Sequence, residues 1–232
     1  MEMIGQGILE ALRLLITGDP EVLRITLLTL KVSGTATLIS VILGLPLGTL
    51  LALKSFPGQR LLLSIANFGM GLPPVVVGLW VSIFLWRSGP FGYLGIMYTP
   101  AAMIIAQAVI ASPVVVALTS SALQQTNPKL RLQIKALGAT RWQYLYLLIR
   151  EARFGVLAAI IAGFGAVVSE VGASMAVGGN IKGQTRVLTT ATVLEVSKGN
   201  FDIAIALSII LLVLSYLITL GLTILQQKKQ GA

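Results

Sequence analysis

Residues 203–225 read IAIALSIILLVLSYLITLGLTIL, an apolar run without a single charged side chain. About 20 apolar residues in a helix are enough to cross the hydrocarbon core of a bilayer. The rest of the chain has the same character, because 56% of its 232 residues are hydrophobic and only 11% are charged. Soluble domains carry about 25% charged residues. The composition therefore predicts an all-α integral membrane protein whose main solvent is lipid.

Four further segments are long and apolar enough to span a membrane. They lie between Lys31 and Lys54, from about Leu61 to Trp86, from about Pro100 to Leu123, and from about Phe154 to Ala173. The helix of the first segment is expected to begin earlier, near Glu21. Together with the run at 203–225, the sequence predicts five transmembrane helices.

The N-terminal apolar run, residues 4–17, is too short to span a bilayer. Glu2 precedes it, and Glu10 and Arg13 interrupt it, which argues against a signal peptide. We expect an amphipathic helix that lies on the membrane surface. The chain then divides into an N-terminal interfacial segment at 1–20, a transmembrane domain at 21–226 and a short cytoplasmic tail at 227–232.

The residue inventory excludes some chemistry. The chain has no cysteine and no histidine, so it lacks thiolate ligands and the side chain that most often binds metals. This argues against a zinc-dependent intramembrane protease and predicts no metal site. The net charge of +9 could indicate nucleic-acid binding in a soluble protein. Here the basic residues cluster in particular loops, which indicates membrane topology rather than a nucleic-acid partner.

Five spans place the two termini on opposite sides of the membrane. With the C-terminus in the cytoplasm, the inner segments hold 10 of the 17 basic residues and one acid, Glu151, while the outer side holds 7 basic and 7 acidic residues. Because basic residues are enriched on the cytoplasmic side, we expect the N-terminus outside and the C-terminus inside. The inner basic residues are Lys54, Arg60, Lys129, Arg131, Lys135, Arg141, Arg150, Arg153, Lys228 and Lys229.

Helix-breaking residues interrupt the second predicted span. Gly69, Gly71, Pro73 and Pro74 stand near its middle, and a proline pair removes backbone donors and kinks a helix. Membranes tolerate such breaks where protein or a water-filled cavity meets the freed groups. A packing kink and a bend that lines a pathway both remain open, and Pro113 is expected to bend the third span in the same way.

Small residues recur at spacing four along the fourth predicted span. Gly155, Ala159 and Gly163 mark this face. Small side chains let helix backbones approach closely in lipid. The face could pack inside the subunit or across a dimer, and the sequence leaves both open.

The longest basic loop, residues 125–143, reads QTNPKLRLQIKALGATRWQ and predicts a short amphipathic helix on the cytoplasmic side. Thr126 or Asn127 can cap its start, and Pro128 suits the first helical position. Leu130, Ile134 and Leu137 then share one face. Gly138 fits just beyond the helix end. The helix could rest on anionic lipid or lie in a groove of a soluble partner; we favour the partner.

The stretch KALGATRWQYLYLLIR, residues 135–150, resembles the coupling-loop signature of ABC importer permeases. That signature has Glu-Ala-Ala, three residues, an invariant glycine that matches Gly138, and a following helix. The sequence departs from it at residues 132–134, which replace Glu-Ala-Ala, and at Glu151, where a proline is common. The resemblance implies a coupling helix at about 128–138 that contacts an ATPase through Leu130, Ile134, Lys135, Ala136, Leu137, Gly138, Ala139 and Arg141.

A second resemblance points to the substrate. Residues 169–190, SEVGASMAVGGNIKGQTRVLTT, resemble the segment after the fourth span in molybdate, sulfate and tungstate permeases, and look most like tungstate permeases. The resemblance covers essentially all of residues 22–226. It implies the five-helix type I, MetI-like core fold in a prokaryotic cytoplasmic membrane. It also implies a homodimer, two ABC ATPase subunits and an extracytoplasmic oxyanion-binding protein.

Several polar residues of this second segment are candidates for a site at the outer end of the fourth span. A tetrahedral dianion needs donors and a positive field, which glycine-rich turns and basic side chains supply. Contact with the binding protein, direct contact with the substrate and a purely structural role all remain open for this set. The candidates are Ser169, Glu170, Ser174, Asn180, Lys182, Thr185 and Arg186.

Glu170 is the acid nearest to a membrane-embedded position, where ionisable groups are costly and often functional. Its negative charge would repel an oxyanion. We therefore expect it to bond a neighbouring helix end or a base such as Arg186, and to have a structural or gate-shaping role.

The sequence predicts no nucleotide-binding site in this chain. Residues 178–185, GGNIKGQT, copy the glycine spacing of a phosphate-binding loop, but Gln184 replaces its lysine and no strand precedes it. We expect ATP and Mg to be bound by the partner ATPase, and this chain to be a tungstate permease without enzymatic activity. Alternatives are a molybdate or sulfate permease, a secondary transporter, and a channel or membrane scaffold. No internal repeat supports the secondary transporter.

Overall fold

Three long helices, α2, α5 and α11, are each apolar and long enough to cross a membrane. They appear in a computed structural model that describes residues 2–227; residues 228–232 of the tail predicted at 227–232, with Lys228 and Lys229, lie outside the described residues. All regular elements among the described residues are helices, joined by loops. Its elements are α1 (Glu2–Thr17), α2 (Pro20–Leu53), α3 (Gln59–Met70), α4 (Pro74–Leu85), η1 (Gly92–Leu94), α5 (Pro100–Gln124), α6 (Pro128–Ala136), α7 (Arg141–Glu151), α8 (Arg153–Val168), α9 (Gly172–Gly178), α10 (Leu188–Ser197) and α11 (Phe201–Gln227).

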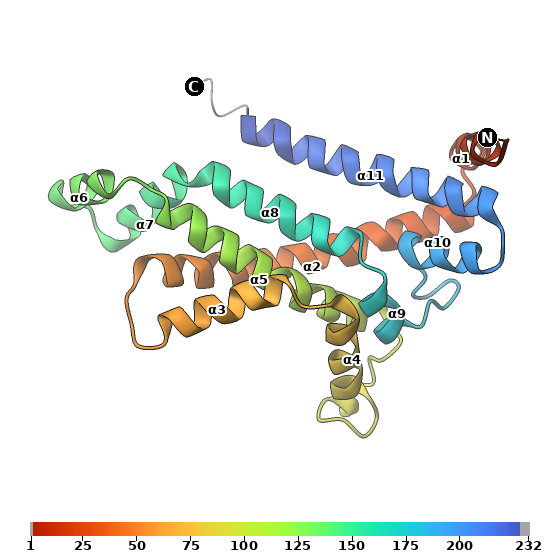
Figure 1. The fold of residues 1–232 in the computed structure, drawn as a ribbon, viewed down its shortest axis with the longest axis horizontal. Coiled ribbons are helices and arrows are strands. Elements are labelled where there is room, and N and C mark those ends of the chain that lie inside the picture. The colour runs from red at the N-terminus through yellow and green to blue at the C-terminus, as the bar shows by residue number, and fades with distance from the viewer. Residues whose placement is uncertain (1, 228–232) are drawn as a thin grey trace.

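The second predicted span is not one straight helix. α3 and α4 meet at an angle of 105° around Gly71–Pro73, so the break predicted from the proline pair is present, and by length and composition the bent pair can still form one span. The cause is local: Pro74 is the first residue of α4, and the extended backbone of Pro73 cannot continue α3. Figure 1 shows α4 projecting sideways from the bundle.

The fourth predicted span is also divided. α8 ends at Val168, the chain bends at residues 169–171, and α9 starts at Gly172, inside the range predicted as helix. α8 is about 24 Å long at 1.5 Å per residue, shorter than the hydrocarbon core. The preceding helix, α7, meets α8 at 70°. By length and composition, the chain has up to five spans if each bent pair is one span.

The core of the bundle is the contact between α2 and α5, where glycines bring the two backbones together. Gly44 faces Val115 and Gly48 faces the carbonyl of Val116. The hydroxyl of Ser40 donates to the Ala108 carbonyl at 3.2 Å and binds the same two helices. Close backbone approach through small residues is the usual way in which helices pack in lipid.

The small-residue face of α8 packs within this subunit. Gly163 lies against Val115 of α5, and Gly155 lies against Ala122 of the same helix. Ala159, between them, is fully buried. Of the two roles that the sequence left open for this face, the described structure shows packing inside the subunit.

The two sets of loops predicted for opposite sides of the membrane lie at opposite ends of the bundle (Figure 1). α6, α7 and the end of α11 gather at one end, and α1, α9 and α10 gather at the other. α1 contacts α11 and is seen nearly end-on while α11 runs across the view, so the two helices cross steeply. The amphipathic helix predicted at 4–17 is therefore present as part of α1.

We predict that Gly48→Ala lowers the stability of the purified protein. The new Cβ would lie 2.7 Å from the Val116 carbonyl oxygen, so α2 and α5 must separate. Overpacking of this kind costs about 1–3 kcal/mol. Thermal unfolding in one detergent measures the effect.

Gly34→Ala on the same helix is the matched control, because no atom lies within 4 Å of its Cβ position and alanine favours a helix. Equal unfolding temperatures for the two variants would contradict the assignment of Gly48 to the helix contact.

Candidate functional site

The short helix predicted in the loop at 125–143 forms as its end signals predict. The Asn127 Oδ1 accepts a hydrogen bond from the Lys129 N–H at 2.9 Å, and Pro128 is the first helical residue. Gly138 follows the helix in the left-handed region at φ 75°. A glycine adopts this conformation without the steric cost that a side chain brings. The sequence therefore placed both ends of α6 correctly.

One face of α6 is anchored to the subunit's own core. Ile134 is only 7% exposed and packs with Leu123 and Leu148, while Leu130 lies at the edge of the same cluster. Arg131 strengthens the anchor: its Nε donates to the Thr126 Oγ1 at 2.9 Å, and its Nη2 donates to the Leu123 carbonyl. α6 is thus fixed to the end of α5.

The opposite face of this loop exposes apolar side chains. Of the predicted stripe, Leu130 and Ile134 pack into the subunit's own core, whereas Leu137 is 87% exposed. Leu137 is the C-cap residue of α6, and its N–H still donates to the Gln133 carbonyl at 3.0 Å. Leu132, Trp142 and Tyr146 are also exposed. We call Leu132, Leu137, Trp142 and Tyr146 the coupling surface, after the role that the sequence resemblance implies for this loop.

The other predicted coupling residues surround this surface. Lys135 is exposed and its Nζ lies 5.4 Å from the centre of the Tyr144 ring. Ala136 and Arg141 are exposed, and Ala139 is half-buried.

At the other end of the bundle, Thr185 organises the glycine-rich loop between α9 and α10. Its hydroxyl donates to the Gly178 carbonyl at 2.5 Å and accepts from the Ile181 N–H at 2.9 Å. Thr185 is fully buried. Gly179, Asn180 and Gly183 take positive φ angles in this loop. Thr185 therefore shapes the loop rather than facing outward.

Asn180 is also buried in the loop's own structure. Its Nδ2 donates to the Thr190 carbonyl at 3.2 Å. The loop is attached to α2, because the Thr29 Oγ1 accepts from the Leu188 N–H at 2.9 Å. The loop that carries Lys182 and Arg186 is thereby held against the first turns of α2.

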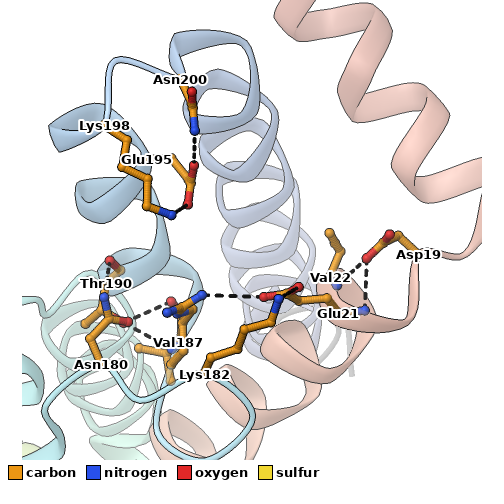
Figure 2. A network of polar contacts seen from close by, with 11 residues as sticks. Asp19, Glu21, Val22, Asn180, Lys182, Val187, Thr190, Glu195, Lys198 and Asn200 are labelled. Carbon is orange, nitrogen blue, oxygen red and sulfur yellow. Dashed lines mark hydrogen bonds and ion pairs between the residues drawn. The ribbon is translucent and has the colours of Figure 1, made fainter.

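Two basic side chains of the loop meet an acid of α2. The Lys182 Nζ lies 2.6 Å from the Glu21 Oε2, as Figure 2 shows, and the Arg186 Nη1 lies 3.5 Å from the Glu21 Oε1. A pocket of about 490 Å³ opens beside this cluster, and Arg24 and Lys31 of α2 line it as well. The five residues bring together segments that are far apart in the sequence.

Sequence reasoning missed Glu21, Arg24 and Lys31 as site residues. Their spacing of three and seven along one predicted helix places them on a common face, which was an available signal. What the sequence could not show is that this face meets the 182–186 loop.

Glu170 bonds the adjacent helix end. Its Oε1 accepts from the Ala173 N–H at 2.7 Å, and its backbone carbonyl accepts from the Thr189 hydroxyl at 2.9 Å. Glu170 is buried. Of the two partners expected for it, the helix end is present, and the described structure has no bond to Arg186.

Ser174 and Ser169 make local contacts. The Ser174 Oγ accepts from the Gln107 Nε2 at 3.1 Å, which joins α9 to α5. Ser169 is exposed, and its hydroxyl donates to the Gly165 carbonyl of its own helix at 2.8 Å. These two serines therefore lie apart from the Lys182 cluster.

A second charged network closes the turn between α10 and α11 (Figure 2). The Lys198 Nζ and the Asn200 Nδ2 each donate to the Glu195 carboxylate at 2.7 Å. The hydrogen bond from Lys198, followed by that from Asn200, holds the pKa of Glu195 below its ordinary value, against an opposing effect of burial. The Glu195 carboxylate is therefore charged at neutral pH. Its contribution to the free energy of unfolding is lost only as pH falls through that lowered pKa.

The chain is similar in sequence to a family of transport proteins and to several of its members. Residues 44–231 match the model of the family described as "Binding-protein-dependent transport system inner membrane component". The tungstate uptake system permease protein TupB of Peptoclostridium acidaminophilum is 40% identical over 98% of this chain and 100% of its own length. The molybdenum transport system permease protein ModB of Escherichia coli is 31% identical over 94% of this chain and all of its own length.

A solved structure shares the fold. The inward-facing MetNI methionine ABC transporter matches with a TM-score of 0.76 at 23% identity, over 90% of this chain and 98% of the matched chain. This likeness concerns the fold alone.

We predict that Thr185→Val loosens the glycine-rich loop although it preserves the shape of the side chain. The Gly178 carbonyl and the Ile181 N–H both lose their partner. An unsatisfied buried group costs about 1–3 kcal/mol. Hydrogen exchange of the Ile181 amide should become faster.

Thr185→Ser retains the hydroxyl and serves as the control, with slow exchange at Ile181. The role of the hydroxyl is disproved if the valine and serine variants exchange at the same rate.

Proposed function

The chain belongs to the family of binding-protein-dependent transport system inner membrane components, and we propose on this basis that it is the permease subunit of an ABC importer for tungstate. The observation that carries the proposal is the 40% identity to a tungstate uptake permease over nearly the full length of both chains. Molybdate is the second candidate substrate, because the 31% identical relative is named for molybdenum.

The basic residues at the outer end support an oxyanion as the substrate. Arg24, Lys31, Lys182 and Arg186 line one pocket together with a single acid, Glu21. An excess of positive charge in a recess attracts anions and raises their local concentration. Lys182 and Arg186 then serve the approach of substrate or the docking of the binding protein, whereas Asn180 and Thr185 hold the loop in shape.

The coupling surface supports an ATPase partner at the opposite end. Exposed leucine and aromatic side chains outside the membrane are typical of a protein interface. The proposed assembly contains two copies of this chain, two ABC ATPase subunits that bind ATP and Mg, and an extracytoplasmic binding protein. The N-terminus lies outside, α1 rests on the membrane surface, and the C-terminus lies in the cytoplasm.

The anchoring of α6 explains how work reaches the membrane helices. Ile134 is buried against Leu123 and Leu148, and Arg131 bonds the end of α5. A push on the coupling surface therefore moves α5, which itself contacts α2, α3, α4, α8 and α9. Because close-packed elements move as units, ATP-driven closure of the partner subunits can switch the access of the pathway.

Reconstituted uptake tests the function. Proteoliposomes that contain the permease and its ATPase subunits, with the binding protein on the opposite side of the membrane from the ATPase, should accumulate tungstate. Uptake should occur only when ATP is present on the side that carries the ATPase subunits. Omission of the ATPase subunits should abolish uptake. Accumulation driven by an ion gradient without ATP would overturn the proposal in favour of a secondary transporter.

We predict that Gly138→Asp uncouples ATP hydrolysis from uptake. A side chain in the left-handed region strains the backbone by about 1–3 kcal/mol, and the new charge stands directly after Leu137 of the coupling surface. Tungstate uptake should fall at least about tenfold while the protein stays in the membrane and ATP hydrolysis continues.

Gly58→Asp is the matched control, because Gly58 also has a positive φ, 90°, and open space around its Cβ position, in a loop before α3. Full transport by Gly138→Asp would remove the coupling role of this turn, and so would an equal loss in Gly58→Asp.

A further inference from the structure

The pocket at the outer end lies between the first turns of α2 and the 182–186 loop. Four cations line it, Arg24, Lys31, Lys182 and Arg186, against one carboxylate, Glu21. In the described part of the chain, Arg24 and Lys31 have no ion pair. The pocket therefore keeps a positive excess after the internal pairing is complete.

The length of α2 places this pocket outside the hydrocarbon. Residues 32–53 carry no charged side chain and extend for about 33 Å at 1.5 Å per residue, close to the thickness of the core of a bilayer. Lys31 and Lys54 flank this stretch. Arg24 and Glu21 then lie in the aqueous compartment at the outer end, where a dissolved anion can reach them.

The Arg24 side chain lies beside the 182–186 loop. Its Nη1 lies 3.4 Å from the position that a Cβ would take at Gly183, so the guanidinium is beside the loop backbone. Gly183 has a φ of 76° and leaves room for this approach. The cations of α2 and of the loop thus border the same space from two sides.

The carboxylate that occupies this cluster is weakly held. The Glu21 side chain is 42% exposed. Its contact with Lys182 is short, at 2.6 Å, but the Lys182 side chain is itself 68% exposed, and the contact of Glu21 with Arg186 is long, at 3.5 Å. Ion pairs between exposed side chains contribute little to stability. Arg186 is only 16% exposed, yet its Nε has no hydrogen-bond partner in the described structure, so its capacity to donate is not saturated.

We propose that this pocket is a binding site for a tetrahedral oxyanion dianion, and that the Glu21 carboxylate occupies the anion position until the oxyanion displaces it. Tetrahedral oxyanions accept paired hydrogen bonds from arginine and attract lysine as a point charge. Glu21 returns when the anion leaves, so the site attracts substrate without trapping it. The inference rests on the proposed function, since it names where the imported anion first binds this chain.

Direct anion binding tests the proposal. The permease–ATPase complex is placed in nanodiscs without the external binding protein, and tungstate, molybdate and sulfate are titrated by calorimetry. Glu21→Gln should tighten anion binding about three- to tenfold, because the substitution removes a negative charge that repels the anion from a partly exposed site. Arg24→Gln should weaken binding by a similar factor.

Arg87→Gln is the matched control for net charge. Arg87 is exposed in the loop after α4, outside the pocket, and its replacement removes the same charge as Arg24→Gln. It should leave the affinity unchanged within about twofold. A loss equal to that of Arg24→Gln would show a diffuse field rather than a site and would overturn the proposal.

Nanodiscs of phosphatidylcholine alone, and with phosphatidylglycerol added, separate a dissolved oxyanion from an anionic lipid headgroup. Saturable oxyanion binding in phosphatidylcholine that Glu21→Gln strengthens supports the proposal. The absence of saturable oxyanion binding in phosphatidylcholine refutes the proposal. So does an unchanged affinity in a Glu21→Gln variant whose thermal unfolding matches that of the unmodified protein. If Glu21→Gln fails to fold, unchanged affinity in Arg24→Gln refutes it. Binding without ATP-driven uptake would instead refute only the proposed function.

Discussion

The hydrocarbon interior offers no hydrogen-bond partner to a peptide group, and the arrangement of this chain follows from that constraint. Continuous helices satisfy most of their own backbone groups, and in the interior of α2 and α5 only the turns at Pro46 and Pro113 lack a backbone donor. Where a helix breaks, protein groups replace the missing bonds. The Glu170 carboxylate accepts from the Ala173 N–H at the start of α9, and this explains a buried acid in a lipid-soluble protein.

The same constraint makes close helix packing the main source of rigidity. Without water to exclude between them, helices in lipid gain from contact area and small residues. Gly44 and Gly48 of α2 and Gly163 of α8 all pack on α5. α5 is therefore the central element of the fold, and it is also the helix to which α6 is attached. The proposed route of work from the coupling surface into the bundle depends on this central position.

The sequence was sufficient for features determined by near neighbours. The apolar runs that became α2, α5 and α11, and the ends of α6 at Asn127 and Gly138, follow from composition, capping and turn chemistry. Proline chemistry predicted a break near Pro73 but not its angle of 105°, which depends on how α4 packs on α9. The meeting of Glu21 with Lys182 joins residues far apart in the chain, and no local pattern encodes such a contact. The exposure of Leu137 depends on how far the core around Ile134 and Leu148 extends, which no local pattern encodes.

The 34-residue length of α2 has a mechanical consequence. At 1.5 Å per residue the helix is a rod of about 51 Å, and it carries Glu21 at one tip and reaches Leu53 at the other. If such a rod tilts by about 10°, one tip sweeps about 9 Å relative to the other. A lever of this length converts a small angular change at one tip into a displacement at the other tip that is larger than the 2.6 Å Glu21–Lys182 contact.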